Sequence, residues 1–149
     1  MIFYEDVTPG DAMTSPTITV DRDEMVAFAK RWNPLPIHVD EAVAQAVAGG
    51  LTAPGLYVLA LKQQLIHQLP DHAVIASFGY DEVRFHEPVR PNDTLHLVYE
   101  WLDRRDSTSK PDRGVVTVRL SLINQAGTTV MSHLDTILMR RAAPPVPRE

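Results

Sequence analysis

The sequence contains no cysteine among its 149 residues. This absence excludes disulfide bonds, a thiol nucleophile and thiolate metal sites, and it suits a reducing compartment. No apolar run approaches the length that spans a membrane, and no basic segment precedes an apolar one near residue 1, so we expect no secretory signal and a cytoplasmic location. The formal net charge of −5 argues against general nucleic-acid binding, which depends on a basic surface.

An apolar content of 44% is enough for one buried core in a chain of this length. The most apolar segment, residues 51–66, is too long for a strand and predicts a buried helix with Pro54 in its first turn. We expect two shorter helices before it. One begins at Asp21 and ends before a proline-rich loop, and the other covers residues 40–47.

After Pro70 the pattern changes to four runs typical of β-strands, at residues 73–85, 93–102, 115–124 and 128–139. Residues 103–114 are polar and show no apolar period, so they predict a long exposed loop. A long helix followed by antiparallel strands predicts one α+β domain over residues 1–141, in which the sheet wraps around the helix. The proline-rich residues 142–149 predict a flexible tail.

The proline-rich loop carries the most specific functional signal. Asn33 and His38 lie five residues apart, with Pro34 and Pro36 between them. Each proline fixes its own φ and restricts the residue before it, so the loop is shaped and not part of a helix face. His38 fits acid/base or ligand-facing duty, although a structural histidine is the alternative. Asn33 fits water binding or a turn cap equally well, and Asp40 is best read as a helix N-cap.

This loop resembles the active-site segment of the MaoC-like acyl dehydratases and (R)-specific enoyl-CoA hydratases, in which an aspartate and a histidine five apart hold one water. Three further stretches resemble the same family, and the first is residues 50–56. Residues 83–95 match its arginine, aromatic, then Pro-Val-x-Pro-Gly-Asp-x-Leu signature with Asn92 in the glycine position, and residues 109–125 are also similar. The resemblance implies a hotdog fold. Asn33 stands where the family has its aspartate.

The resemblance also implies roles for individual residues. His38 would act as acid/base, Asn33 would hold the water, and the backbone N–H groups at Gly55 would polarise a thioester carbonyl. The residues implied to bind substrate are Pro54, Leu56 and Tyr57 beside the central helix, and Arg104, Lys110 and Arg113 as contacts for the phosphates of coenzyme A or a carrier protein. An ordinary solvated loop is the alternative for the last three. No histidine spacing resembles a metal site, and we expect no cofactor beyond the coenzyme A of the substrate.

Three functions fit these observations. The first is a hydratase or dehydratase acting on a trans-2-enoyl or 3-hydroxyacyl thioester. The second is a hotdog thioesterase. Such enzymes usually carry a carboxylate on or near the central helix, and residues 51–68 contain none, which counts against this function. The third is a non-catalytic subunit that binds acyl thioesters, which Asn33 favours because an amide cannot exchange a proton at neutral pH. A homodimer is expected, because a lone hotdog exposes a sheet edge.

Overall fold

The computed structural model describes residues 1–143. An antiparallel sheet with strands in the order β1, β4, β5, β6, β3 forms its main layer, and β2 pairs with β4 outside that order. A short 3-10 turn, Tyr4–Asp6, precedes the first strand. The strands are β1 (Ala12–Thr14), β2 (Ile18–Thr19), β3 (Val74–Phe85), β4 (Thr94–Asp106), β5 (Arg113–Ile123) and β6 (Thr129–Arg140).

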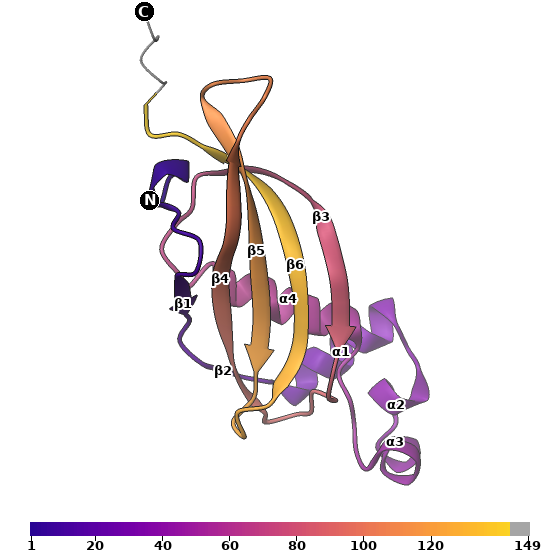
Figure 1. Cartoon of the computed structure of the whole chain (residues 1–149). Coiled ribbons are helices and arrows are strands. Elements are labelled where there is room, and N and C mark those ends of the chain that lie inside the picture. The colour runs from indigo at the N-terminus through magenta and orange to yellow at the C-terminus, as the bar shows by residue number, and fades with distance from the viewer. Residues whose placement is uncertain (144–149) are drawn as a thin grey trace, which may run out of the picture.

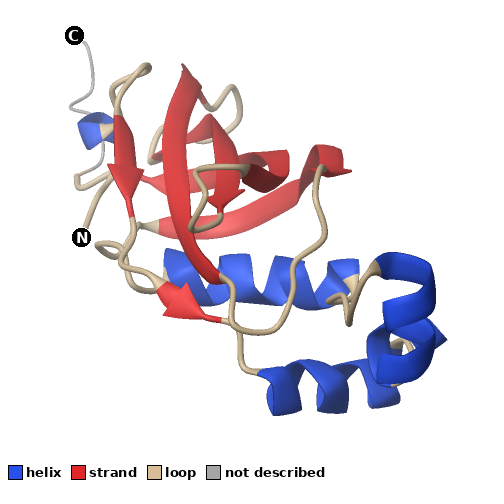
Figure 2. Cartoon of the chain, turned by 90° about the horizontal axis from the view of Figure 1, so that it is seen from below, coloured by secondary structure: helices blue, strands red, loops and turns tan. Residues whose placement is uncertain are grey.

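Helix α4 (Gly55–Ile66) crosses the concave face of this sheet (Figures 1 and 2). Most residues of α4 are apolar, and they occur on every side of the helix, as in a helix that is buried all round. Leu61 and Leu65 are buried in a single core with residues from the strands, among them Leu97, Leu120 and Met139. The structure therefore confirms the predicted α+β domain with a sheet wrapped around a long helix.

The other helices lie beside α4 and near the end at which it begins with Gly55 (Figure 2). They are α1 (Arg22–Trp32), α2 (Pro36–Val39) and α3 (Glu41–Ala48). The predicted start at Asp21 is confirmed, because its side chain accepts a hydrogen bond from the N–H of Glu24 and caps α1. The expectation that a helix begins near residue 51 is wrong, because residues 51–54 form no helical turn and Pro54 is the N-cap of α4.

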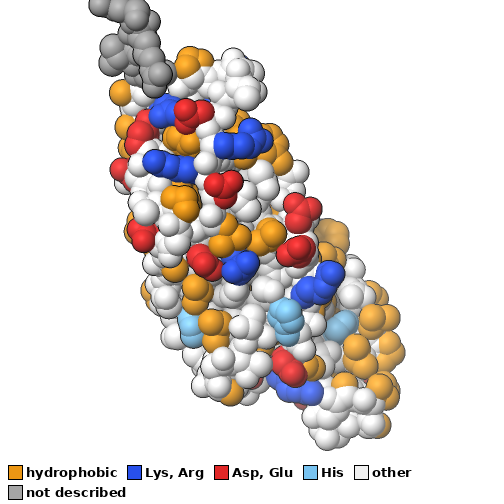
Figure 3. Space-filling view, in the orientation of Figure 1, with side chains coloured by type: hydrophobic (Ala, Val, Ile, Leu, Met, Phe, Trp, Pro, Cys, Tyr) orange, Lys and Arg blue, Asp and Glu red, His pale blue; other side chains and the backbone are white. Residues whose placement is uncertain are grey.

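Strands β4, β5 and β6 bury alternate residues against α4, as the sequence pattern predicts for half-buried strands. Figure 3 shows the outer face, where acidic and basic side chains are interspersed. The predicted loop over residues 103–114 is wrong for half of its length. β4 continues to Asp106 and β5 begins at Arg113, so only residues 107–112 turn. This end of the hairpin extends past the core, so Asp103 to Asp106 are exposed on both faces and lack an apolar period.

Strand β3 is an edge strand with an irregular course. Its pairing with β6 shifts register between Ser77 and Tyr80 and again between Asp81 and Arg84. Gly79 lies within the first shift, with a φ of 136°. Such bulges bend an edge strand and increase its local twist. β3 also exposes several large apolar side chains, including Ile75, Phe78 and Phe85.

Within residues 1–143, none of the helices is both long and apolar enough to cross a membrane. The predicted flexible tail begins with Ala142 and Ala143, which belong to no helix or strand. Residues 144–149 lie outside the described part of the chain, so the prediction of flexibility there is untested.

Candidate active site

The proline-rich loop is a shaped connection between α1 and α2. Asn33 ends α1 with an extended φ of −157°, and Pro36 occupies the first turn of α2. The carbonyl of Asn33 accepts from the N–H of Leu35, and the carbonyl of Leu35 accepts from the N–H of His38, both at 2.9 Å. These bonds hold the backbone around the two prolines. The His38 side chain that follows is buried, with 6% of its surface exposed.

The imidazole of His38 has a defined partner. Its Nδ1 lies 2.6 Å from the backbone carbonyl oxygen of Thr52 and 3.2 Å from the hydroxyl of the same residue. A carbonyl oxygen only accepts hydrogen bonds, so Nδ1 carries the proton. In the neutral ring Nε2 is then unprotonated, and it can accept a proton from a bound water.

Backbone hydrogen bonds hold the segment that leads into α4. The N–H of Thr52 donates to the carbonyl of Ile37 at 3.1 Å, and the N–H of Ala53 donates to the carbonyl of Val89 at 2.7 Å. The guanidinium of Arg90 donates to the carbonyls of Gly50 and Ala48 at 3.0 and 2.5 Å. Arg90 therefore fixes the turn between α3 and this segment. Arg90 lies within residues 83–95, the stretch in which the sequence matches the family signature.

Gly55 begins α4 under the ring of Phe85. A Cβ atom at Gly55 would come within 2.7 Å of the Phe85 ring, so glycine is needed for this close approach. Close packing is therefore one role of Gly55. The N–H groups of Gly55 and Leu56 donate to no acceptor within residues 1–143, as expected for the first turn of a helix. Together with the helix dipole they favour an oxygen that gains negative charge.

A cavity of about 470 Å³ opens beside Gly55. Ile37 and Thr52, which adjoin His38, form part of its wall, and Phe85, His86 and Glu87 contribute from the end of β3. The ring of His86 is held by Ser132, with 2.8 Å between its Nε2 and the serine hydroxyl. Glu87 is the one carboxylate on this wall, and sequence reasoning did not single it out for chemistry. Nothing short of the fold could have placed it beside Gly55.

Asn33 and Asp40 differ in what their side chains do. The Asn33 amide forms no hydrogen bond within residues 1–143, so the turn-cap interpretation finds no support. The Asp40 carboxylate accepts from the N–H groups of Ala42 and Val43 and caps α3, as predicted. Asp40 is thus occupied structurally as the cap of α3.

Pro54, Leu56 and Tyr57 lie at the start of α4 but face different surroundings. Pro54 is buried at the N-cap, and Leu56 is exposed. Tyr57 is buried, and its ring centroid lies 5.2 Å from that of Phe28. Burial, together with the charge of Glu24, raises the pKa of the Tyr57 hydroxyl. Tyr57 therefore belongs to the core.

The basic residues expected to contact phosphates lie at the opposite end of the sheet from α2 (Figure 1). Arg104 donates to the carbonyls of Tyr4 and Glu5, each at 3.0 Å, and so anchors the N-terminal turn. Arg113 is paired with Asp112 at 2.7 Å, and Lys110 lies in the β4–β5 turn. Within one protomer the structure does not bring these three side chains to His38.

The fold is that of the hotdog proteins of the acyl dehydratase type, and comparison with known proteins agrees with this class. The model of the MaoC-like domain matches residues 6–125. This chain belongs to the MaoC-like dehydratase family. The crystal structure of a MaoC-like dehydratase from Rhodospirillum rubrum superposes with a TM-score of 0.90 at 32% identity, covering 96% of this chain and 99% of that one.

Two curated relatives differ in what is known of them. The uncharacterized protein YdeM of Bacillus subtilis is 28% identical over 140 residues, which cover 92% of this chain and 98% of YdeM. Mesaconyl-CoA hydratase of Cereibacter sphaeroides is 30% identical over 111 residues, which cover 73% of this chain. The matched region makes up only 28% of that hydratase, so its activity cannot be transferred to this chain as a whole.

Proposed function

We propose that the protein is a hydratase or dehydratase that interconverts trans-2-enoyl and 3-hydroxyacyl thioesters of coenzyme A. The observation that carries this proposal is the imidazole of His38, whose protonated Nδ1 is bound to the carbonyl of Thr52, leaving Nε2 free to accept a proton. Family membership supports the same chemistry, and the relative from Cereibacter sphaeroides is a hydratase that acts on a coenzyme A thioester. We also propose a cytoplasmic role in fatty acid metabolism, which the absence of cysteine suits.

The reaction needs only a water and the groups described above. The N–H groups of Gly55 and Leu56 donate to the thioester oxygen and stabilise the charge that develops there. The Nε2 atom of His38 accepts one proton from a water held by the Asn33 amide, while the water oxygen bonds to carbon three. The imidazolium then returns a proton to carbon two, so that one whole water has been added. Dehydration is the reverse, and neither direction uses a cofactor.

The amide at position 33 supports a second candidate function. Asn33 can orient a water, but it cannot take or release a proton at neutral pH. A positioned acid or base contributes about 10²–10⁴ in rate, so its loss is large enough to leave a subunit that binds acyl thioesters without useful turnover. A thioesterase has less support, because no aspartate or glutamate occurs in α4 (Gly55–Ile66). Glu87 is the carboxylate on the cavity wall that could substitute for the aspartate.

We propose a homodimer that forms through the edge strand β3. Within residues 1–143 no strand pairs with its outer edge, and β3 exposes Ile75, Phe78 and Phe85. Antiparallel pairing of β3 with its copy is a closed two-fold arrangement. It would place the β4–β5 turn of one protomer near the proline-rich loop of the other, so that Lys110 and Arg113 could reach the phosphates of coenzyme A across the dimer.

The test follows the loss of enoyl-thioester absorbance for trans-2-enoyl-CoA substrates of short and medium chain length. Wild-type protein is compared with Asn33→Asp and Glu87→Gln. We expect slow hydration by the wild type and a rate at least about tenfold higher for Asn33→Asp, because the carboxylate restores proton transfer. A large loss in Glu87→Gln would assign the missing carboxylate to Glu87. No hydration by the wild type or by Asn33→Asp would contradict the proposal and favour the binding subunit.

A further inference from the structure

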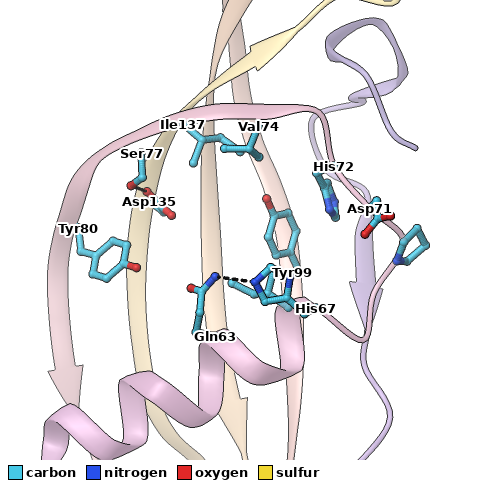
Figure 4. A pocket seen from close by; sticks show the side chains of 12 residues that line it. Gln63, His67, Asp71, His72, Val74, Ser77, Tyr80, Tyr99, Asp135 and Ile137 are labelled. Carbon is cyan, nitrogen blue, oxygen red and sulfur yellow. Dashed lines mark hydrogen bonds between the residues drawn. The ribbon is translucent and has the colours of Figure 1, made fainter.

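A second cavity, of about 530 Å³, lies beside the C-terminal half of α4 and is covered by the strands β3, β4 and β6 (Figure 4). Part of its wall is aliphatic, with Ile66 and Ile137. Polar residues also line it, among them Gln63, Tyr80 and Asp135. We call this space the polar cavity. None of the residues that line the cavity beside Gly55 lines it as well.

Asp135 provides an acceptor on the wall of the polar cavity. It is 9% exposed, and its Oδ1 accepts a hydrogen bond of 2.6 Å from the hydroxyl of Ser77. Its other carboxylate oxygen accepts from no donor in the described part of the chain. The charge of Asp135, together with burial, raises the pKa of Tyr99 and keeps that hydroxyl protonated. This second oxygen can therefore accept a hydrogen bond from a molecule bound in the cavity.

Tyr80 lies directly opposite Asp135 in the pairing of β3 with β6. Its contact with Lys62 determines whether its hydroxyl can donate a hydrogen bond. Lys62 is 1% exposed, and its Nζ donates to the hydroxyl of Tyr80 at 3.1 Å and to Oε1 of Gln63 at 3.4 Å. Within residues 1–143 no carboxylate comes within 4.0 Å of this nitrogen. Because the Tyr80 oxygen accepts from Lys62, its own proton is available to donate. The cross-strand pair therefore offers one donor and one acceptor.

These two groups define what fits between them. A hydroxyl group accepts from Tyr80 and donates to Asp135, so it satisfies both. A carboxylate would meet the charges of Asp135 and of Asp71, which also lines the cavity. A methyl group would offer no partner to the Asp135 carboxylate and the Tyr80 hydroxyl in place of the water that it displaces, which is unfavourable. The charges of Lys62 and Asp135 offset each other, which again favours a neutral ligand.

We propose that the polar cavity binds the hydroxylated far end of the acyl group on the substrate. This assignment rests on the proposed function, which places the thioester at Gly55. Gly55, Leu59 and Gln63 are spaced by four residues and follow one another along one face of α4. Gln63 lies about 12 Å further along the helix than Gly55. An acyl chain of this length that follows this face of α4 would reach Gln63, which lines the polar cavity.

The test compares binding of saturated acyl-CoA thioesters, so that it needs no turnover. Three series of matched chain length are titrated calorimetrically into the wild type, with a terminal methyl, hydroxyl or carboxylate group. We expect the hydroxylated thioester to bind about tenfold more tightly than its methyl counterpart at the chain length that reaches the cavity. Tyr80→Phe should lose most of this preference, and Asp135→Leu should reverse it. Thr136→Val is the control, because Thr136 is the neighbour of Asp135 on the other face of β6 and should keep the preference.

Each result has one meaning. Equal binding of methyl and hydroxyl thioesters at every length, or tighter binding of the carboxylate, would overturn the assignment even if the wild type hydrates simple enoyl-CoAs. An unchanged preference in both Tyr80→Phe and Asp135→Leu would do the same. Since Tyr80 lies on the exposed edge strand, Tyr80→Phe gives a folded variant even if Asp135→Leu does not. A hydroxyl preference in the absence of any hydration would support the cavity and contradict the proposed function.

Discussion

The Nδ1 atom of His38 donates to the backbone carbonyl of Thr52 over 2.6 Å, and this bond joins the proline-rich loop to the segment that leads into α4. The imidazole is thus oriented by main chain, and its tautomer does not depend on which side chain occupies position 52. The same segment ends at Gly55, so one backbone path positions both the imidazole and the first N–H groups of α4.

Thr52→Val tests whether the carbonyl or the hydroxyl of Thr52 orients His38. Valine keeps the carbonyl and the branched shape, and it removes only the hydroxyl that lies 3.2 Å from Nδ1. We therefore expect kcat/KM for enoyl-thioester hydration to stay within about fivefold of wild type, a change worth about 1 kcal/mol. A loss comparable to that of a catalytic residue would show that the hydroxyl fixes the ring.

Gly55→Ala tests the close approach of Phe85 to the start of α4. The new methyl group would meet the Phe85 ring at 2.7 Å, so the ring or the helix must shift. Phe85 is 52% exposed and can move in part, so we expect the free energy of unfolding to fall by about 1–2 kcal/mol in denaturant titrations.

The double variant Gly55→Ala/Phe85→Ala provides the control. Removing the ring also removes the clash, so the alanine at position 55 should cost much less in the Phe85→Ala background than alone. If the two effects simply add, the cost of Gly55→Ala comes from somewhere other than this contact.

Arg90→Ala should destabilise the turn that precedes Thr52. The two hydrogen bonds from the guanidinium to the carbonyls of Gly50 and Ala48 are lost, which costs about 1.5–3 kcal/mol. Arg84→Ala is the matched control, because Arg84 donates only to the carbonyl of the adjacent Val83 and should change stability by less than about 0.5 kcal/mol. Thermal or denaturant unfolding measures both, and equal effects would contradict the role given to Arg90.

Stability should decrease on the acid side because of two histidines. Burial lowers the pKa of His133 and of His72 below the ordinary 6.5. Each therefore binds fewer protons in the folded than in the unfolded protein, so its contribution is complete above about pH 6.5 and is lost as the pH falls below that value. The expected loss is up to about 1.4 kcal/mol per pH unit for each histidine. His133→Phe should reduce this slope in unfolding experiments between pH 6.5 and 5, and an unchanged slope would contradict the assignment.

The sequence predicted the fold where local pattern and burial agree. The apolar segment that became α4, the caps at Asp21 and Asp40, and the alternation in β5 are all local signals that the core reinforces. The continuation of β4 to Asp106 was missed because a strand that projects past the core needs no apolar period. The bulges of β3 were missed for a related reason, since pairing with β6 determines them.

The site was predictable only in part. The loop residues Asn33 and His38 stand out because prolines and spacing are visible in one dimension. Contacts between distant segments are not visible there, and they include the bond from His38 to Thr52 and the anchoring of the α3 turn by Arg90. Nothing in the sequence indicated the polar cavity. A lysine such as Lys62 in an apolar helix is expected to be exposed, whereas the fold buries it.

The most direct test of the account is the hydration rate of His38→Ala beside wild type on the trans-2-enoyl-CoA that the wild type uses best. Circular dichroism and thermal unfolding would establish that the variant is folded. The account predicts measurable wild-type turnover and a rate at least about 100-fold lower in His38→Ala, because the acid/base group is gone. Turnover in folded His38→Ala equal to that of the wild type would show that His38 is not the group that moves the proton.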